Sequence, residues 1–313
     1  IEEGVKIIAV YDDIADYILV KQGGKINAVG TPDKPIVMTS EKEEPGAWGG
    51  IHICGRAHTN AEGGKGSSEI GGAVYGGNND ADNSGTLQYI RLEYTGFAFD
   101  EEHEANGISF YGVGNGTIVD HCQAYKGSDD GFEFFGGSVN VSNLVAVSCS
   151  DDSFDWTEGW NGKGTNLVAY QEAESTLGYD CDCLMECDNN GSNNAATPVA
   201  HPVLKNLILV GNGGSKQGIR LRAGTEVEID NAKVCGKGQP LTVETALTEN
   251  ALKNGTSKLT NITLTSELSC KEGIYTHADF IAVTSNKVDA NLSYSSFEDI
   301  KKECSWMNGS WVK

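Results

Sequence analysis

A five-residue pattern returns three times near the middle of the chain: GISFY at 107–111, GFEFF at 131–135 and SFDWT at 153–157. Each copy places a small residue first, and apolar side chains then alternate with outward-facing ones. Apolar side chains at every second position indicate a short β-strand with one buried face. The copies follow one another at intervals of about 22 to 24 residues, which points to a structural repeat.

The same pattern continues on both sides of these three copies. Further copies lie at 50–54, 184–188 and 218–222, and a weaker one lies at 240–244. The interval is too short for a four-stranded propeller blade, and the fixed Leu/Asn template of a leucine-rich repeat is absent. It is typical of one coil of a β-solenoid, and the longer intervals predict loops inserted at the corners.

We therefore predict an all-β fold, a right-handed parallel β-helix with loop insertions. One domain is expected over residues 1–313, with the final coil and a cap in 266–313. Stacked coils would align equivalent side chains in rows about 4.8 Å apart. The first predicted inward row is Ile51, Ile108, Phe132, Phe154, Met185 and Ile219. The second is Ile53, Phe110, Phe134, Trp156, Cys187 and Leu221.

A second pattern, Asn followed by alternating apolar residues, comes after the later copies. It begins at Asn143, Asn166, Asn206, Asn231 and Asn261. We interpret each as the start of a strand after a corner, with the stacked amides serving a structural role.

Several longer segments resemble a family of exported or surface parallel β-helix proteins of Bacteroidetes-type bacteria. They are residues 30–40, 46–51, 83–94, 129–137, 151–155 and 306–311. The resemblance implies the fold and an extracellular or outer cell-surface location. Members of that family are largely of unknown function, so the resemblance implies no catalytic residues. It also implies that a longer segment precedes the first strand, so we interpret Ile1 as a trimmed end.

The charge of the chain limits its partners. It has 23 Lys and Arg against 44 Asp and Glu, for a formal net charge of −21. Nucleic acid and anionic membrane surfaces require basic patches and are therefore excluded as partners. No run of eighteen apolar residues is present, so no membrane span is predicted. A polysaccharide, a surface protein assembly or self-association remain as expected partners.

Nine cysteines predict disulfide bonds in an oxidising compartment. The close spacing of Cys181, Cys183 and Cys187 leaves a stapled loop or a soft-metal site as alternatives. No paired CxxC zinc motif is present.

The outward position between the two inward rows is occupied by polar and charged side chains. Along the stack it reads His52, Ser109, Glu133, Asp155, Glu186 and Arg220. Carboxylates in successive coils would stand about 4.8 Å apart, so at least one pKa should rise unless a cation lies between them. The candidate catalytic residues are Glu133, Asp155, Glu186 and Arg220. The candidate metal ligands are Asp129, Asp130, Asp151, Asp152, Asp182 and Asp188.

Three interpretations of these acids stay open. Stacked carboxylates with loop carbonyls provide the oxygen ligands that Ca²⁺ prefers. Adjacent coils also provide the carboxyl separation of about 5 to 5.5 Å that retaining glycosidases use, and Arg220 or Arg222 would neutralise a uronate in a lyase. The third interpretation is a solvated acidic face closed by Arg220 as an ion pair.

Aromatic side chains beside the acids suggest a sugar site. Tyr111 and Phe135 fall on an outward row next to the acids, and Trp160 follows an acidic strand at a corner. With Arg222 they form the predicted ligand-binding set, because exposed rings beside hydrogen-bonding acids are common in carbohydrate sites. The alternative is that such aromatics only cover the edges of the solenoid.

Three functions follow from these patterns. The first is a noncatalytic surface module that binds glycan or docks to a surface assembly, with Ca²⁺ as a structural ion. The second is a polysaccharide lyase or glycoside hydrolase that uses the acidic residues. The third is a self-assembling structural protein, since the ends of a solenoid expose unpaired backbone groups.

Overall fold

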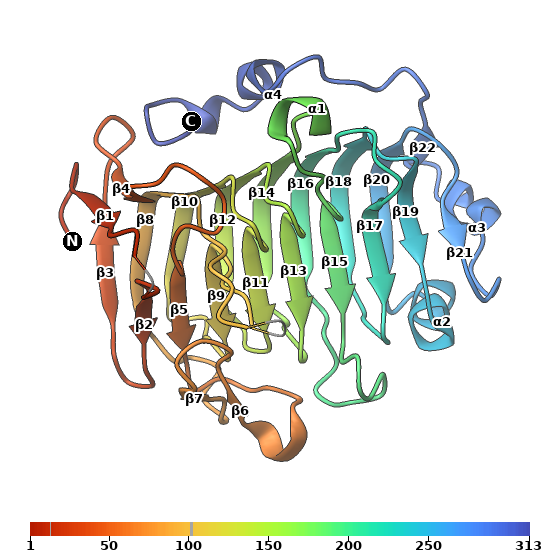
Figure 1. Cartoon of the computed structure of the whole chain (residues 1–313). Helices are drawn as coiled ribbons and strands as arrows, with labels where there is room; N and C mark the ends of the chain where they lie inside the picture. The colour runs from red at the N-terminus through yellow and green to blue at the C-terminus, as the bar shows by residue number, and fades with distance from the viewer. Residues whose placement is uncertain (13, 101–102) are drawn as a thin grey trace.

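Each copy of the repeat forms one strand, and each strand pairs in parallel with its counterpart in the next coil. The computed structural model describes residues 1–12, 14–100 and 103–313. Its strands stack into two long parallel sheets that run the length of the molecule (Figure 1). The predicted parallel β-helix is confirmed.

Sheet B contains the copies of the five-residue pattern. In order of pairing, its strands are β2 (Ile18–Val20), β5 (Ile51–Cys54), β9 (Ile108–Tyr111), β11 (Phe132–Phe135), β13 (Phe154–Thr157), β15 (Met185–Asp188), β17 (Gln217–Arg222), β19 (Gln239–Val243) and β21 (Ser269–Cys270).

Sheet A contains the longer strands. They are β1 (Lys6–Ala9), β3 (Ile26–Val29), β4 (Ile36–Ser40), β8 (Gly85–Glu93), β10 (Ile118–Tyr125), β12 (Asn140–Val147), β14 (Lys163–Tyr170), β16 (Val203–Val210), β18 (Glu228–Cys235), β20 (Lys258–Leu264) and β22 (Lys287–Val288).

Short elements decorate the corners and the C-terminal end. An antiparallel hairpin joins β6 (Gly66–Ser67) and β7 (Val74–Tyr75). The helices are α1 (Glu174–Leu177), α2 (Ala246–Asn254), α3 (His277–Ala282) and α4 (Phe297–Glu303), with 3₁₀ turns η1 (Glu62–Gly64) and η2 (Ser305–Met307). Within the described residues, no helix has the length and apolar character needed to cross a bilayer.

Both predicted inward rows lie in the core. Phe132 pairs in register with Ile108 on one side and Phe154 on the other, and all three are buried. Phe110 and Phe134 of the second row stack with ring centroids 4.9 Å apart. The alternation of apolar residues therefore determined which side of each strand faces inward, because a shift by one residue would expose the whole row.

The repeated asparagines lie inside strands, so the prediction that they begin strands is wrong. Asn143, for example, lies within β12 and has a φ of 55°, in the left-handed region. Asn tolerates this conformation better than most residues, and it bends the strand without interrupting the pairing with its neighbours. The predicted stacking of amides is confirmed: Asn166 donates to Asn143 over 2.8 Å, and Asn206 donates to Asn166 over 3.0 Å.

The last part of the chain turns back along the outside of sheet A. We call residues 289–313 the C-terminal strap; it includes α4 and runs towards the N-terminal end (Figure 1). The backbone N–H of Ser310 donates to the carbonyl of Pro32 over 2.8 Å, and that of Lys313 donates to Gln123 Oε1 over 2.8 Å. The strap covers an apolar stripe on sheet A, where Trp311 is fully buried.

All nine cysteines are free thiols, so the predicted disulfides are wrong. Cys187 lies in the second inward row, where it packs as a small apolar side chain within the core. Cys235 of sheet A and Cys304 of the strap lie in the apolar layer between the two. Eight of the nine are buried, so these side chains fill packing positions in successive coils.

Candidate functional site

The predicted outward row on sheet B is present and in register. Glu133 on β11 lies opposite Asp155 on β13, and Asp155 lies opposite Glu186 on β15. The row continues to Ser109 on one side of Glu133 and to Arg220 beyond Glu186. We call Glu133, Asp155 and Glu186 the carboxylate ladder.

Additional acids enter from the corners that precede these strands. Asp129 and Asp130 come before β11, Asp151 and Asp152 come before β13, and Asp182 comes before β15. Together with the carboxylate ladder they form what we call the acidic cluster. Within it, several sets of side chains bring one oxygen each to within 4.8 Å of one another: Asp129, Asp130 and Asp151; Asp130, Glu133 and Asp155; Asp152, Asp155 and Glu186.

Burial makes the negative charge of the acidic cluster costly. Burial and neighbouring carboxylates hold the pKa of Glu133 and of Asp155 well above their ordinary values. Burial and the charge of Asp151 raise the pKa of Asp129 to about 7. Burial and the charge of Asp182 raise the pKa of Asp151 to about 6. The cluster therefore favours any species that supplies positive charge, whether a proton or a metal ion.

Among the described residues, one buried oxygen of the acidic cluster has no hydrogen-bond partner. Asn106 Nδ2 donates to Glu133 Oε2 over 2.6 Å, and the backbone N–H of Cys183 donates to Asp152 Oδ1 over 2.6 Å. Asp155 Oδ1 is buried and has no hydrogen-bond partner among the described residues. A buried carboxylate oxygen without a donor is expensive and calls for a proton or a cation at that position.

Arginines neutralise one end of the carboxylate ladder. Arg220 Nη1 lies 2.8 Å from Glu186 Oε2, and Arg220 Nε lies 3.2 Å from Glu244 Oε1. Arg222 Nε lies 2.7 Å from Asp188 Oδ1, and Arg222 also pairs with Glu186. Arg220 thus closes the row as an ion pair, as one of the three interpretations expected. Asp188 faces Arg222 and lies outside the three all-oxygen sets of the acidic cluster.

The three predicted sugar-stacking aromatics are buried, so the prediction of exposed rings is wrong. Tyr111 and Phe135 stack on each other 4.4 Å apart and are covered by Tyr75 of the β6–β7 hairpin. Trp160 is buried in the core and stacks on Phe134 at 4.1 Å. For Tyr111 and Phe135 the local pattern could not reveal this, because the covering hairpin belongs to an insertion from an earlier coil.

Sequence reasoning missed several residues of this region. Glu69, in the hairpin insertion, accepts a hydrogen bond from the Tyr111 hydroxyl over 3.1 Å and contributes to the raised pKa of Glu133. Glu104, in the loop after β8, contributes in the same way to the raised pKa values of Asp129 and Asp151. Only the interval between repeats signalled these loops, and that signal does not indicate where their side chains point.

Two partly exposed aromatics, also missed, lie at the Ser109 end of the row. Tyr17 and Phe99 meet edge to face with ring centroids 5.8 Å apart, and Tyr17 meets His52 at 6.1 Å. Tyr17 is 38% exposed and Phe99 is 39% exposed. These two rings, and not the predicted ones, offer apolar surface to a ligand on this face.

The donor atoms of the acidic cluster fit a hard divalent cation. Three of its sets contain carboxylate oxygens alone, which are the ligands that Ca²⁺ prefers. A fourth set joins Asp152 and Asp182 to Cys183. Among the described residues, neither Cys181 nor Cys187 joins Cys183 in such a set, whereas soft metals prefer several thiolate ligands. The soft-metal alternative is therefore disfavoured.

Comparison with known proteins agrees with this architecture. The family described as "Pectate-lyase like beta helix domain" matches residues 1–313. No curated protein and no solved structure matches the chain. The family match confirms the β-helix family part of the resemblance, whereas the bacterial lineage and export stay predictions. Since the match spans the whole length, this chain belongs to the family of pectate-lyase-like β-helix domains.

Proposed function

We propose that this protein is an extracellular or cell-surface module, without catalytic activity, that binds Ca²⁺ in its acidic cluster and holds a glycan through that ion. The observation that supports this most is the convergence of carboxylates from three successive coils around Asp155, whose buried Oδ1 has no hydrogen-bond partner among the described residues. Ca²⁺ accepts six to eight oxygen ligands, so a site on a strand surface retains positions for hydroxyl or carboxylate oxygens of a glycan.

Electrostatics favours a bound cation over a merely solvated acidic face. Surface acids that are fully hydrated keep nearly ordinary pKa values, whereas the pKa values of Asp130 and Asp152 lie well above the ordinary value because both are buried among other acids. Within the carboxylate ladder, the described ion pairs of the arginines are with Glu186, at one end of the row. A divalent ion near Glu133 and Asp155 would offset the repulsion at the other end.

The state of the arginines argues against a lyase that uses Arg220 or Arg222 to neutralise a uronate. Burial alone would lower the pKa of Arg220, but hydrogen bonds and charge from Glu244 and Glu186 outweigh it, so the pKa lies above its ordinary value. Arg222 is likewise engaged by Asp188 and Glu186. Neither guanidinium can neutralise a uronate without breaking an ion pair.

A glycoside hydrolase is the second candidate, and one observation favours it. One oxygen each of Asp130, Glu133 and Asp155 lies within 4.8 Å of the others. This is close to the carboxyl separation of about 5 to 5.5 Å in retaining glycosidases, and a raised pKa would suit a general acid. The same spacing arises wherever acids occupy adjacent coils, so geometry alone favours no particular reaction.

Cation binding is tested first, by calorimetric titration of the metal-free protein with Ca²⁺. We expect saturable binding that Asp155→Asn and Glu133→Gln each weaken at least tenfold. Asp33→Asn serves as the matched control, because Asp33 is an exposed acid far along the chain from the cluster. Unchanged affinity in both cluster variants would exclude the proposed site.

Glycan binding and turnover are then separated on the same proteins. We expect a glycan array to show binding in Ca²⁺ that is lost in EDTA, while reducing-sugar and ultraviolet assays detect no cleavage of the bound glycan. Cleavage that disappears in Glu133→Gln with Ca²⁺ affinity retained would instead establish the hydrolase. Glycan binding that is equal in EDTA would contradict the role of the ion.

Self-association stays a prediction with one observation in its favour. At the N-terminal end of the described chain, β1 and β2 pair with a strand on one side only. Ile8 and Val10 near that edge are 50% and 52% exposed. Light scattering at increasing protein concentration tests this, and a constant monomer mass would remove the self-assembling alternative.

A further inference from the structure

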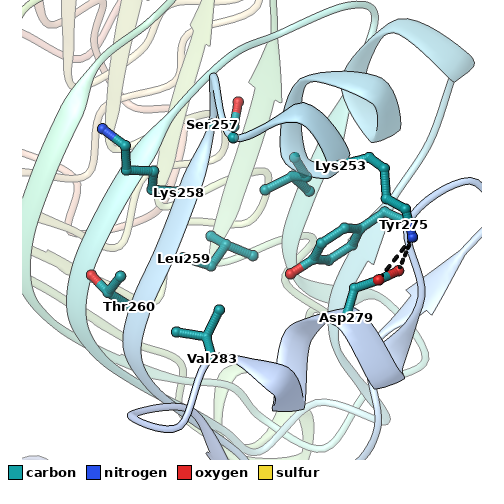
Figure 2. A pocket seen from close by; sticks show the side chains of 10 residues that line it. Lys253, Ser257, Lys258, Leu259, Thr260, Tyr275, Asp279 and Val283 are labelled. Atoms are coloured by element: carbon teal, nitrogen blue, oxygen red, sulfur yellow. Dashed lines mark hydrogen bonds and ion pairs between the residues drawn. The ribbon is translucent and has the colours of Figure 1, made fainter.

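A cavity of about 320 Å³ lies at the C-terminal end of the solenoid, between α2, β20 and α3 (Figure 2). It is remote in sequence and in the stack from the acidic cluster, which lies on β11, β13 and β15. Cavities of roughly 300 Å³ and above are the size range in which proteins bind small molecules. Its wall is mainly apolar, with Leu252 from α2, Leu259 from β20 and Val283 after α3.

Tyr275 places a polar group in this apolar wall. The residue is only 6% exposed, and Figure 2 shows its hydroxyl pointing between Leu259 and Val283, into the cavity. No hydrogen-bond partner of this hydroxyl occurs among the described residues. Burial, with a smaller contribution from the charge of Asp279, raises the pKa of Tyr275 to about 12. The hydroxyl therefore keeps its proton at neutral pH and remains a donor.

The position of Tyr275 is set by a buried carboxylate. Glu249 of α2 is fully buried and accepts hydrogen bonds from the backbone N–H groups of Glu272 over 2.7 Å, Ile274 over 2.6 Å and Tyr275 over 3.1 Å. Three charge-assisted bonds to one carboxylate hold this loop in a single geometry. The hydroxyl is therefore held in place before any ligand arrives, which lowers the entropy cost of binding.

The opposite wall is anchored as well. Thr276 and Asp279 form a capping box at the start of α3, and Phe280 of the same helix is buried in the core. A capping box satisfies two backbone donors at once and fixes the first turn of a helix. The cavity is thus a gap between fixed elements and not a space that closes when a side chain rotates.

The charged groups at the rim are already paired. Lys253 Nζ lies 2.8 Å and 2.9 Å from the two carboxylate oxygens of Asp279, as the dashed lines in Figure 2 show. Lys258 Nζ lies 3.0 Å from Glu228 Oε1. A charged ligand would have to compete with these pairs and would lose hydration in an apolar cavity. A neutral ligand faces neither cost.

We propose that this cavity is a binding site for a small neutral aromatic or acyl compound that bears a carbonyl oxygen. Its apolar part packs against Leu252, Leu259 and Val283, and its carbonyl oxygen accepts a hydrogen bond from the Tyr275 hydroxyl. A group of about ten non-hydrogen atoms suits the volume. The site is separate from the proposed Ca²⁺ site, and its occupancy does not depend on that ion.

The test uses 4-fluoroacetophenone as probe, with the full chain, followed by ¹⁹F NMR. We expect saturable binding with a dissociation constant on the order of 1 mM or tighter, given the usual affinity per atom of small ligands. Tyr275→Phe keeps the ring and removes the donor, so binding should weaken by about 3- to 10-fold. Val283→Trp fills the cavity and should abolish binding.

Matched controls distinguish a loss of binding in the cavity from a general loss of structure. Leu247→Ala changes an exposed residue of α2 that does not line the cavity, and it should leave the affinity unchanged. Thermal unfolding of every variant confirms that it is folded, which is expected because Val283 is 37% exposed and the Tyr275 hydroxyl has no partner to lose. The charged analogues 4-fluorobenzoate and 4-fluorobenzylamine should bind at least tenfold more weakly.

Three results would overturn the proposal. They are the absence of saturable binding by the folded wild-type chain, an affinity that Tyr275→Phe leaves unchanged, and a charged analogue that binds as well as the ketone. Since the acidic cluster plays no part, addition of Ca²⁺ or EDTA should not alter the affinity for the probe.

Discussion

The outer faces of the two sheets differ in polarity: that of sheet A is apolar and that of sheet B is acidic. On sheet A, Val145, Val168 and Ile208 form an apolar stripe in successive coils, and the C-terminal strap covers it. On sheet B, Glu133 and Asp155 form an acidic row instead, and the described cations that pair with the acidic cluster, Arg220, Arg222 and Lys216, lie towards its far end.

The contrast shows how stacking acts on the side chains at outward positions of a solenoid. Stacking repeats each side chain at about 4.8 Å, so a favourable interaction is multiplied along the row and an unfavourable one is multiplied as well. In the apolar row, stacking repeats favourable contacts between apolar side chains, and the C-terminal strap covers the row. In the acidic row, stacking repeats the repulsion between carboxylates. We therefore expect protons or a bound cation to neutralise part of its charge.

The largest expected effect is on the sheet A side. Trp311 of the strap is fully buried and meets His121 edge to face at 5.2 Å. We expect Trp311→Ala to lower the free energy of unfolding by about 3 to 5 kcal/mol, because it opens a large cavity beneath the strap. Urea unfolding measures this. Trp306→Ala, at a partly exposed ring of the same strap, should cost much less, and equal costs would show that the strap is not packed as described.

The next effect concerns protons on the sheet B side. The folded-state pKa values of Asp129 and Asp151, about 7 and about 6, lie above the ordinary 3.8, so the folded state binds protons more tightly than the unfolded state. Stability in EDTA should therefore be highest near pH 4 and fall as the pH rises towards 7, with a smaller share from Asp151, because its exposed side chain is screened by solvent. Unfolding midpoints at successive pH values check this.

A double variant provides the control for that pH dependence. Asp129→Asn with Asp151→Asn should flatten the fall in stability between pH 4 and 7, and saturating Ca²⁺ should flatten it in the wild type. If the metal-free protein were instead most stable near pH 8, the carboxylates of the acidic cluster would not repel one another as inferred.

A smaller effect is expected at the arginine end of the carboxylate ladder. Arg222 joins Asp188 and Glu186 with different nitrogens of one guanidinium. Lysine cannot reproduce that fork, so Arg222→Lys should cost about 1 to 2 kcal/mol in thermal unfolding. The double variant Arg222→Lys/Asp188→Asn should lose less stability than the sum of the two single losses. Strict additivity would argue that the two side chains are not coupled.

The smallest effect is expected at the bend within the sheet A strands. Asn206 has a φ of 60° and exchanges amide hydrogen bonds with Asn166 and Asn231. Asn206→Ala should cost about 1 kcal/mol, since alanine is strained in this conformation and cannot continue the amide row. Asn206→Gly loses the amides without the strain and should cost less. A larger cost for glycine than for alanine would contradict this account.

The parts of the fold that depend on local pattern were predictable. The inward rows, the register that brings Glu133 opposite Asp155, and the pairing of Arg220 with Glu186 all follow from one periodicity. The placement of Asn143 was predicted wrongly, because a preference for the left-handed region is shared by corners and by bends within a strand. Tyr111 and Phe135 were expected at the surface because nothing in their own coil indicates the hairpin that covers them.

By itself, the sequence determined a parallel β-helix with an acidic row on one sheet, since alternation and interval are properties of neighbouring residues. Only the tertiary structure decided which outward positions are covered and which stay open. The strap lies over sheet A strands far from it in the chain, and the hairpin over Tyr111 belongs to a loop inserted in the coil before. Such contacts are set by how loops of particular length pack against a finished solenoid, and no periodic pattern encodes that packing.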